Sequence, residues 1–146
     1  MEAKDEELER RFNVLVVDDE QGMRDLFAFT LHSEGYNVIT AASGYEALES
    51  VRGGPFDLAF IDVKMPKMNG LETYRALKKI FPDLSVFMMT AYSVENLVRE
   101  AIREGALGCL YKPFDPEEVL ATVEKVKKQQ AGAQKGKLPS PQQTQK

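Results

Sequence analysis

Five polar side chains stand where apolar runs of the sequence end. A buried strand has no structural need of adjacent acids, because like charges repel and each carboxylate loses hydration on burial. The five residues at these places are Asp18, Asp19, Asp62, Thr90 and Lys112. They offer three carboxylates, one hydroxyl and one ammonium group, a set that could hold a cation and a phosphate.

A hard divalent cation would remove the repulsion between three carboxylates. Mg²⁺ prefers oxygen ligands and is typically held by one or two carboxylates together with phosphate oxygens. Lys112 could pair with a phosphate and Thr90 could donate to it. Because an acid beside Mg²⁺ can attack phosphorus, the set predicts phosphoryl transfer to a carboxylate. Without metal, at least one of the three acids should have a raised pKa.

Helix capping is the simpler explanation for any one of these aspartates. Three aspartates at one edge, together with Thr90 and Lys112, favour a site instead.

Strands and helices would position these residues, and two patterns of apolar residues that alternate along the chain indicate them. Short apolar runs, typical of strands buried on both faces, occur at 12–17, 36–40, 57–61, 84–89 and 107–111. Amphipathic helical stretches lie between them, one of them after Ser93. This alternation predicts an α/β fold with a parallel sheet and helices on both faces. Right-handed crossovers bring the carboxyl ends of all strands to one edge, where ligands bind in such folds.

Capping signals support the expected helices. Ser43 with Glu46 fits the capping-box pattern, and Asn69 with Glu72 is a looser version of it. Asp115 followed by proline predicts a helix start. Glycines stand where three helices should end, at Gly35, Gly53 and Gly105.

Length and composition suit one domain of 146 residues. We expect a charged N-terminal arm at 1–11, a folded domain at 12–128 and a flexible Gln-, Gly- and Pro-rich tail or linker at 129–146. The net charge of -4 argues against direct nucleic-acid binding, and no apolar run approaches a membrane span. The single cysteine excludes an internal disulfide. The charged N-terminus does not resemble a signal peptide, so the cytoplasm is the expected location.

Four segments carry a resemblance to a known family. VLVVDDE, FIDVKMPKMNG, MTAYS and LYKPFD look like the signature segments of response-regulator receiver domains in two-component signalling. The resemblance covers residues 12 to about 128 and implies a flavodoxin-like doubly wound (βα)5 sandwich with strand order 2-1-3-4-5. It also implies a partner, either a sensor histidine kinase or a histidine phosphotransfer protein.

The resemblance assigns roles to the polar residues. Asp62 would be the phosphoacceptor, with Mg²⁺ bound directly by Asp19, largely through water by Asp18, and by the backbone carbonyl of Lys64. Lys112 would pair with the phosphoryl group, and the Lys112–Pro113 bond is usually cis in the family. Thr90 would move to hydrogen-bond the phosphoryl group.

That movement would reshape a face formed by the helix after Ser93, the strand at 107–111 and the helix beginning at Pro116, where a downstream protein would bind. Many receivers carry an aromatic switch residue where this sequence has Cys109, and we expect Tyr111 to lie in the wrong register to replace it.

Lys64 and Tyr92 occupy positions that modulate self-dephosphorylation in the family. The pair resembles that of the single-domain receiver of the sporulation phosphorelay. A bulky Tyr92 could screen the phosphoryl group from water, which predicts slow dephosphorylation.

Three functions remain open from the sequence. The chain could be a stand-alone receiver, or the receiver portion of a longer transcriptional regulator whose output domain is absent, since the Gln-rich tail looks like an interdomain linker. A remote third is an aspartyl-phosphate phosphatase, although such enzymes have Asp-x-Asp where this sequence has adjacent acids.

Overall fold

The computed structural model of the chain describes residues 11–91 and 95–137, with side chains as far as residue 132. Five parallel strands form a sheet in the order β2-β1-β3-β4-β5. They are β1 (Asn13–Val17), β2 (Asn37–Ala41), β3 (Leu58–Asp62), β4 (Ser85–Thr90) and β5 (Gly108–Tyr111). The predicted fold class and strand order are confirmed.

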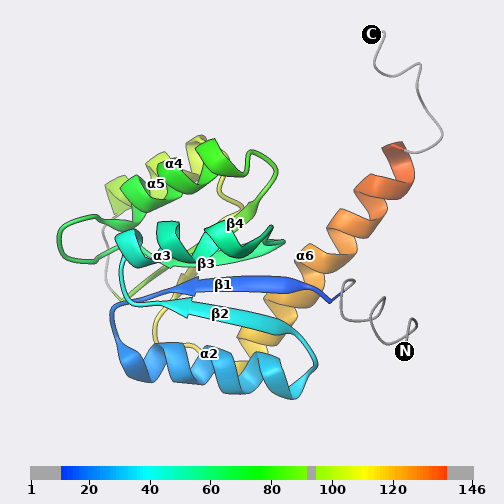
Figure 1. Ribbon diagram of the computed structural model, residues 1–146, viewed down its shortest axis with the longest axis horizontal. Coiled ribbons are helices and arrows are strands. Elements are labelled where there is room, and N and C mark those ends of the chain that lie inside the picture. Colours follow the sequence, from blue (N-terminus) through cyan, green and yellow to red (C-terminus); the bar gives the residue numbers. More distant parts are fainter. Residues whose placement is uncertain (1–10, 92–94, 138–146) are drawn as a thin grey trace, which may run out of the picture.

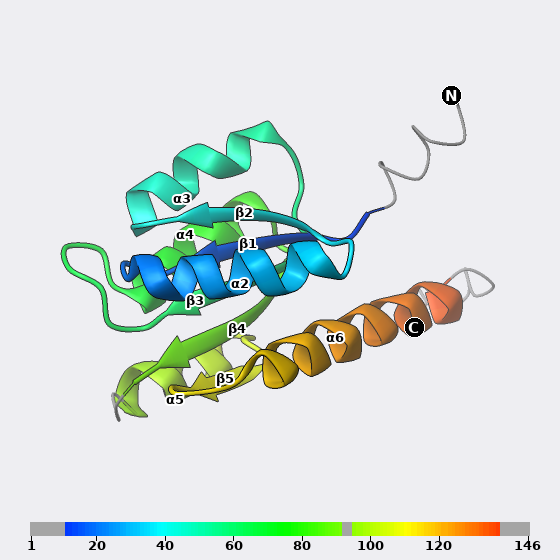
Figure 2. The same ribbon diagram turned by 90° about the horizontal axis from the view of Figure 1, so that it is seen from below.

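Helices cover both faces of the sheet (Figure 1). They are α2 (Gln21–Ser33), α3 (Gly44–Ser50), α4 (Gly70–Ile80), α5 (Glu95–Arg103) and α6 (Pro116–Lys137), with a short 3-10 turn η1 (Val51–Gly53) after α3. Helices α2 and α6 lie on one face, and the other three lie on the opposite face (Figures 1 and 2).

The alternation of side chains along each strand divides the core between these two faces. In β1, Leu15 and Val17 pack in the cluster that includes α3, α4 and α5, whereas Val14 and Val16 pack against α2 and α6. All four side chains are fully buried, which explains why the run is apolar at every position.

Three of the strands, β2, β3 and β4, end one residue later than their apolar runs suggested. Asp62 and Thr90 were expected after their strands, but they are the last residues of β3 and β4. The backbone ladder continues past the apolar residues, because Val63 N–H donates to Met89 O at 2.8 Å and Lys112 N–H donates to Thr90 O at 2.8 Å. Strand pairing, rather than hydropathy, sets these ends.

Most of the predicted capping residues cap their helices. Asn69 and Glu72 form a complete capping box, and Ser43 accepts from the Glu46 N–H. Glycines with positive φ follow α2 and α5, at Gly35 and Gly105. After η1 the positive φ falls on Gly54 rather than on the predicted Gly53, because Gly53 is still part of the turn.

The last helix runs past residue 128, where we expected the folded domain to end. Helix α6 continues to Lys137, and it projects beyond the sheet on the side of the strand starts (Figures 1 and 2). Gln130 Nε2 donates to Asp57 O at 2.9 Å and to Ser85 Oγ at 3.0 Å, so the extension is tied to the sheet. Extending a packed helix avoids a new nucleation cost. Residues 1–10 and 138–146 lie outside the described residues.

No helix within the described part of the chain has both the length and the apolar character required to cross a membrane.

Candidate functional site: a carboxylate cluster at one sheet edge

Three carboxylates meet at the carboxyl edge of the sheet. One oxygen from each of Asp18, Asp19 and Asp62 lies within 4.8 Å of the others. Asp18 and Asp19 follow β1, and Asp62 ends the neighbouring strand β3. Asp18 and Asp62 are buried and Asp19 is exposed, so the cluster opens to solvent at Asp19.

The ammonium group of Lys112 stands against this cluster. Its Nζ lies 2.8 Å from Asp18 Oδ2, 3.2 Å from Glu20 Oε1 and 3.7 Å from Asp62 Oδ2. Burial by itself would lower the pKa of Lys112, but the hydrogen bond and charge of Asp18, with the charge of Asp62, raise it overall. Lys112 is therefore a permanent cation at the site.

The surroundings of Asp62 disfavour its ionised carboxylate. Its pKa is raised to about 7, first by burial and then by the charge of Asp18. Lys112 opposes this rise, as does a hydrogen bond from the backbone of Lys64. The expected raised pKa is thus found, and burial is its largest single cause.

The loop after β1 is held by bonds to the first aspartate. Asp18 Oδ1 accepts the Glu20 N–H at 2.9 Å, and Asp18 O accepts Arg24 Nη1 at 2.8 Å. Its Oδ2 is buried and lies 2.8 Å from the Nζ of Lys112, with which it forms an ion pair.

Close backbone packing fixes the position of Asp62. Gly70, the first residue of α4, donates its N–H to Val63 O at 2.8 Å. A Cβ added at Gly70 would lie 2.3 Å from Asp62 O and 2.6 Å from Val63 Cα. Only glycine therefore permits this approach of α4 to the end of β3.

Thr90 and Lys112 are brought to the same edge by β4 and β5. Thr90 is buried and pairs in register with Tyr111, and its carbonyl accepts the Lys112 N–H. The Lys112–Pro113 peptide bond is cis, as expected. Of the predicted site residues, Lys64 is exposed, and Tyr92 lies outside the described residues.

The sequence argument about Tyr111 was wrong. Cys109 and Tyr111 are two residues apart on β5 and therefore share a face, because strand side chains alternate. Their side chains interact. Burial raises the pKa of the Cys109 thiol to about 11, so it is a partly buried thiol with little thiolate character.

Sequence reasoning missed three residues at the site: Glu20, Arg24 and Gly70. Glu20 directly follows the acid pair, so its position in the same loop was the available signal. Gly70 ends the segment FIDVKMPKMNG, so the family resemblance was the available signal for it, whereas the contact of Arg24 with the backbone of Asp18 had none.

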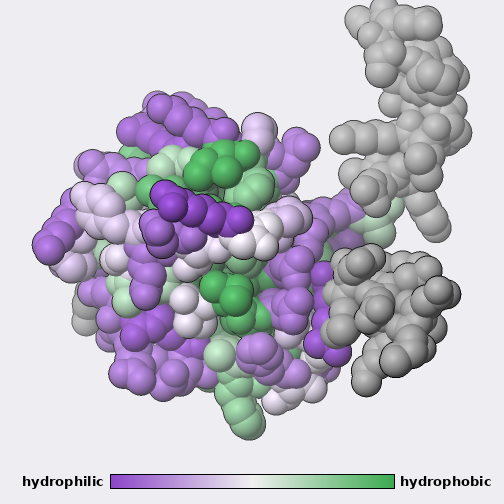
Figure 3. Space-filling model, in the orientation of Figure 1, coloured by the Kyte–Doolittle hydropathy of each residue, from purple (hydrophilic) through white to green (hydrophobic). Residues whose placement is uncertain are grey.

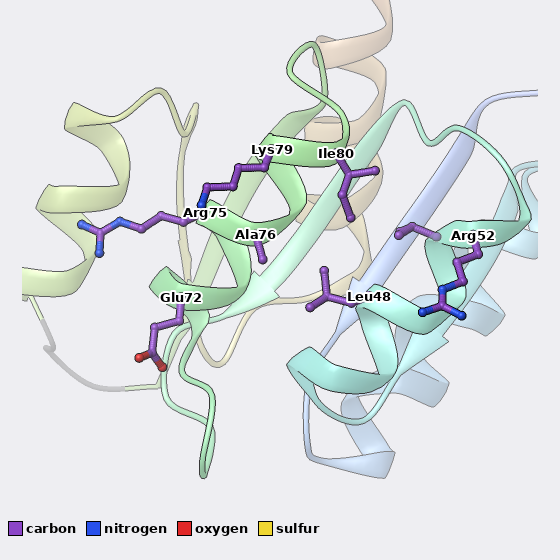
Figure 4. A pocket seen from close by; sticks show the side chains of 8 residues that line it. Leu48, Arg52, Glu72, Arg75, Ala76, Lys79 and Ile80 are labelled. Atoms are coloured by element: carbon purple, nitrogen blue, oxygen red, sulfur yellow. The ribbon is translucent and has the colours of Figure 1, made fainter.

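One groove, of about 570 Å³, lies away from the carboxylates. It runs between α3 and α4, and Leu48, Ala76 and Ile80 face into it (Figure 4). Arg75 points away from this groove toward α5, where it pairs with Glu104 at 2.6 Å (Figure 4). In the view of Figure 3 the surface is mostly hydrophilic, with separate hydrophobic patches. None of the predicted site residues lines this groove.

Residues 14–124 match the family described as response regulator receiver domain. Transcriptional regulatory protein ZraR of Escherichia coli (strain K12) is 42% identical over 113 residues, which are 77% of this chain and 26% of that protein. Sporulation initiation phosphotransferase F of Bacillus subtilis (strain 168) is 38% identical over 112 residues, which are 77% of this chain and 90% of that protein.

Solved structures agree with this match. The chemotaxis protein CheY4 of Vibrio cholerae superposes with a TM-score of 0.75 at 36% identity, over 80% of this chain and 98% of that one. NtrX of Brucella abortus superposes with a TM-score of 0.80 at 29% identity, over 88% of this chain and 29% of that one.

A doubly wound sheet with acids, a threonine and a lysine at its carboxyl edge defines a phospho-accepting signalling domain. The chain belongs to the response regulator receiver domain family. It spans about a quarter of the length of ZraR.

Proposed function

We propose that Asp62 accepts a phosphoryl group from a phosphohistidine of a sensor histidine kinase or a histidine phosphotransfer protein. The observation that supports this is the grouping of three carboxylate oxygens within 4.8 Å, with Lys112 Nζ 3.7 Å from Asp62 Oδ2. A carboxylate with a cation at this distance can act as a nucleophile while the cation receives the incoming negative charge.

In the proposed step, an oxygen of Asp62 attacks phosphorus. A phosphorus–oxygen bond forms, the phosphorus–nitrogen bond to the imidazole breaks, and the bonding pair stays on the imidazole nitrogen. Lys112 then pairs with the phosphoryl oxygens and Thr90 donates to them. Because Asp62 attacks as the carboxylate, whatever lowers its raised pKa increases its reactivity at neutral pH.

The residues present fit Mg²⁺. The donors are all oxygens, and two of them are on buried side chains. Asp18, Asp19, Asp62 and the carbonyl of Lys64 would hold the ion. When bound, Mg²⁺ would neutralise charge on the carboxylates and on phosphate oxygens. Asp18 would hold it largely through water.

The same site would control a surface for a downstream protein. Three large apolar side chains are exposed on α5, β5 and the turn between them: Ile102 (44%), Leu107 (47%) and Tyr111 (57%). Because the backbone of Thr90 bonds that of Lys112 directly after β5, movement of Thr90 would be transmitted to this face. Cys109 would stand at the switch position, with Tyr111 beside it on the strand.

Self-dephosphorylation is proposed to be slow, with Lys64 and Tyr92 as its modulators. Whether the chain acts alone or within a longer regulator depends on the gene beyond Lys146. The likeness to part of ZraR and NtrX supports the longer regulator, and the likeness to nearly all of sporulation initiation phosphotransferase F supports the single domain. The phosphatase hypothesis gains no support from these relatives. We place the protein in the cytoplasm.

Intact mass spectrometry after incubation with Mg²⁺ and acetyl phosphate tests the proposal. Wild type should gain one phosphoryl group and Asp62→Asn none, and decay of the modified species gives the dephosphorylation rate. Gain in both proteins would identify a different acceptor. No gain in wild type would overturn the proposed phosphoacceptor role.

A further inference from the structure

The side chain of Glu20 does not cap the helix α2 that follows it. Glu20 is the N-cap residue of α2, with φ -92° and ψ 121°, but its side chain makes no capping hydrogen bond to the described helix. Glutamate is not among the favoured N-cap residues. Its Oε1 instead lies 3.2 Å from the Nζ of Lys112, far along the chain.

With this contact, the ammonium group of Lys112 lies closer to Asp18 and Glu20 than to Asp62. The ammonium nitrogen is within hydrogen-bond distance of Asp18 at 2.8 Å and Glu20 at 3.2 Å, but it is 3.7 Å from Asp62. Asp18 also fixes the backbone of Glu20, because its Oδ1 accepts the Glu20 N–H. Asp18 and Glu20 thus form one clamp on the lysine.

We propose that Glu20 is a positioning residue that holds the Lys112 ammonium group on the Asp18 side of the cluster and competes with the phosphoryl group on Asp62 for it. This inference rests on the proposed function. The Glu20 side chain is 66% exposed, so its hold on Lys112 is weak and can be exchanged. Phosphorylation therefore has to break the contact, and losing Glu20 should speed it.

Two variants distinguish the loss of the Glu20–Lys112 contact from the loss of the negative charge of Glu20. Glu20→Gln removes the charge, whereas Glu20→Asp keeps it on a side chain one methylene shorter, which we expect not to reach Lys112. Glu49→Gln is the matched control, because Glu49 of α3 is 70% exposed and pairs at 3.3 Å with Arg52 of η1.

The first readout is the NMR signal of the Lys112 ammonium group in the metal-free, unphosphorylated protein, assigned by its loss in Lys112→Arg. We expect it to shift and to exchange faster with water in both Glu20 variants, and to stay unchanged in Glu49→Gln. An unchanged signal in the Glu20 variants would overturn the contact on which the inference depends.

The second readout is the rate of phosphorylation by acetyl phosphate. Both Glu20 variants should react roughly twofold to fivefold faster than wild type, in keeping with a weak exposed pair. If Glu20→Gln alone is faster, the cause is repulsion of the anionic donor and the positioning role is wrong. If wild type reacts but neither variant differs from it, this inference alone fails. No reaction in wild type removes the proposed function as well.

Discussion

The Nζ of Lys112 lies 2.8 Å from Oδ2 of Asp18, and both side chains are almost wholly buried. This pair joins the loop after β1 to the residue after β5 across the middle of the sheet. It also supplies the positive charge that makes the neighbouring acids tolerable within the fold.

Removing that charge should destabilise the metal-free protein. Lys112→Ala leaves Asp18 buried without a cation, and we expect the free energy of unfolding to fall by about 2–4 kcal/mol. Urea unfolding in EDTA measures the loss. Lys79→Ala, on the exposed side of α4, is the control and should change stability by less than about 0.5 kcal/mol. Equal stability of the two variants would contradict the role of Lys112.

The raised pKa of Asp62 makes metal-free stability depend on pH. The pKa is about 7 in the folded protein and about 3.9 in an unfolded chain. Between these values the folded protein binds more protons, so its stability falls as pH rises. We expect this residue to cost about 1–3 kcal/mol between pH 5 and pH 8.

Urea unfolding of wild type and Asp62→Asn from pH 5 to pH 8 in EDTA tests this dependence. The variant should lose the decline that Asp62 causes and should be the more stable protein at pH 8. A wild-type curve parallel to that of the variant would show that Asp62 does not titrate in this range.

Mg²⁺ should stabilise the folded protein, because a ligand that binds only the folded state adds about RT ln(1 + [L]/Kd) to its stability. At a hundredfold excess over Kd the gain is about 2.7 kcal/mol, which raises Tm by several degrees. Differential scanning fluorimetry with MgCl₂ measures the shift. Asp19→Asn should reduce it strongly, whereas Asp25→Asn, an exposed acid on α2, should not. A full shift in Asp19→Asn would remove Asp19 from the metal site.

Gly70 should tolerate no side chain. In Gly70→Ala the new Cβ would meet Asp62 O at 2.3 Å, so the start of α4 has to move and we expect a loss of about 1–3 kcal/mol. Gly22→Ala in α2 is the control, since nothing lies within 4 Å of its added Cβ, and it should be neutral or stabilising. Thermal unfolding compares the two. Equal melting temperatures would contradict the close approach.

The α6 extension should contribute to stability through Gln130. Gln130→Ala removes hydrogen bonds to Asp57 O and Ser85 Oγ, and we expect a loss of about 0.5–1.5 kcal/mol. Gln129→Ala, on the exposed side of the same helix, is the control. Urea unfolding at pH 7 decides between them, and an equally small effect in both variants would mean that the extension is not anchored.

The sequence by itself determined the fold class, the strand order expected from the family resemblance and the meeting of five polar residues at one edge. Strands buried on both faces have to be apolar at every position, as in β1, and parallel connections have to place all carboxyl ends together. Both rules depend on local sequence patterns and on chain connectivity, so they can be applied to the amino-acid sequence alone.

Tertiary structure decided which of these groups touch. That Lys112 lies nearer Asp18 and Glu20 than Asp62 depends on side-chain conformation across β1, β3 and β5. The course of α6 past residue 128 depends on Gln130 meeting backbone and side-chain oxygens at the strand starts. Such contacts join residues that are far apart in the sequence, so composition and periodicity do not predict them.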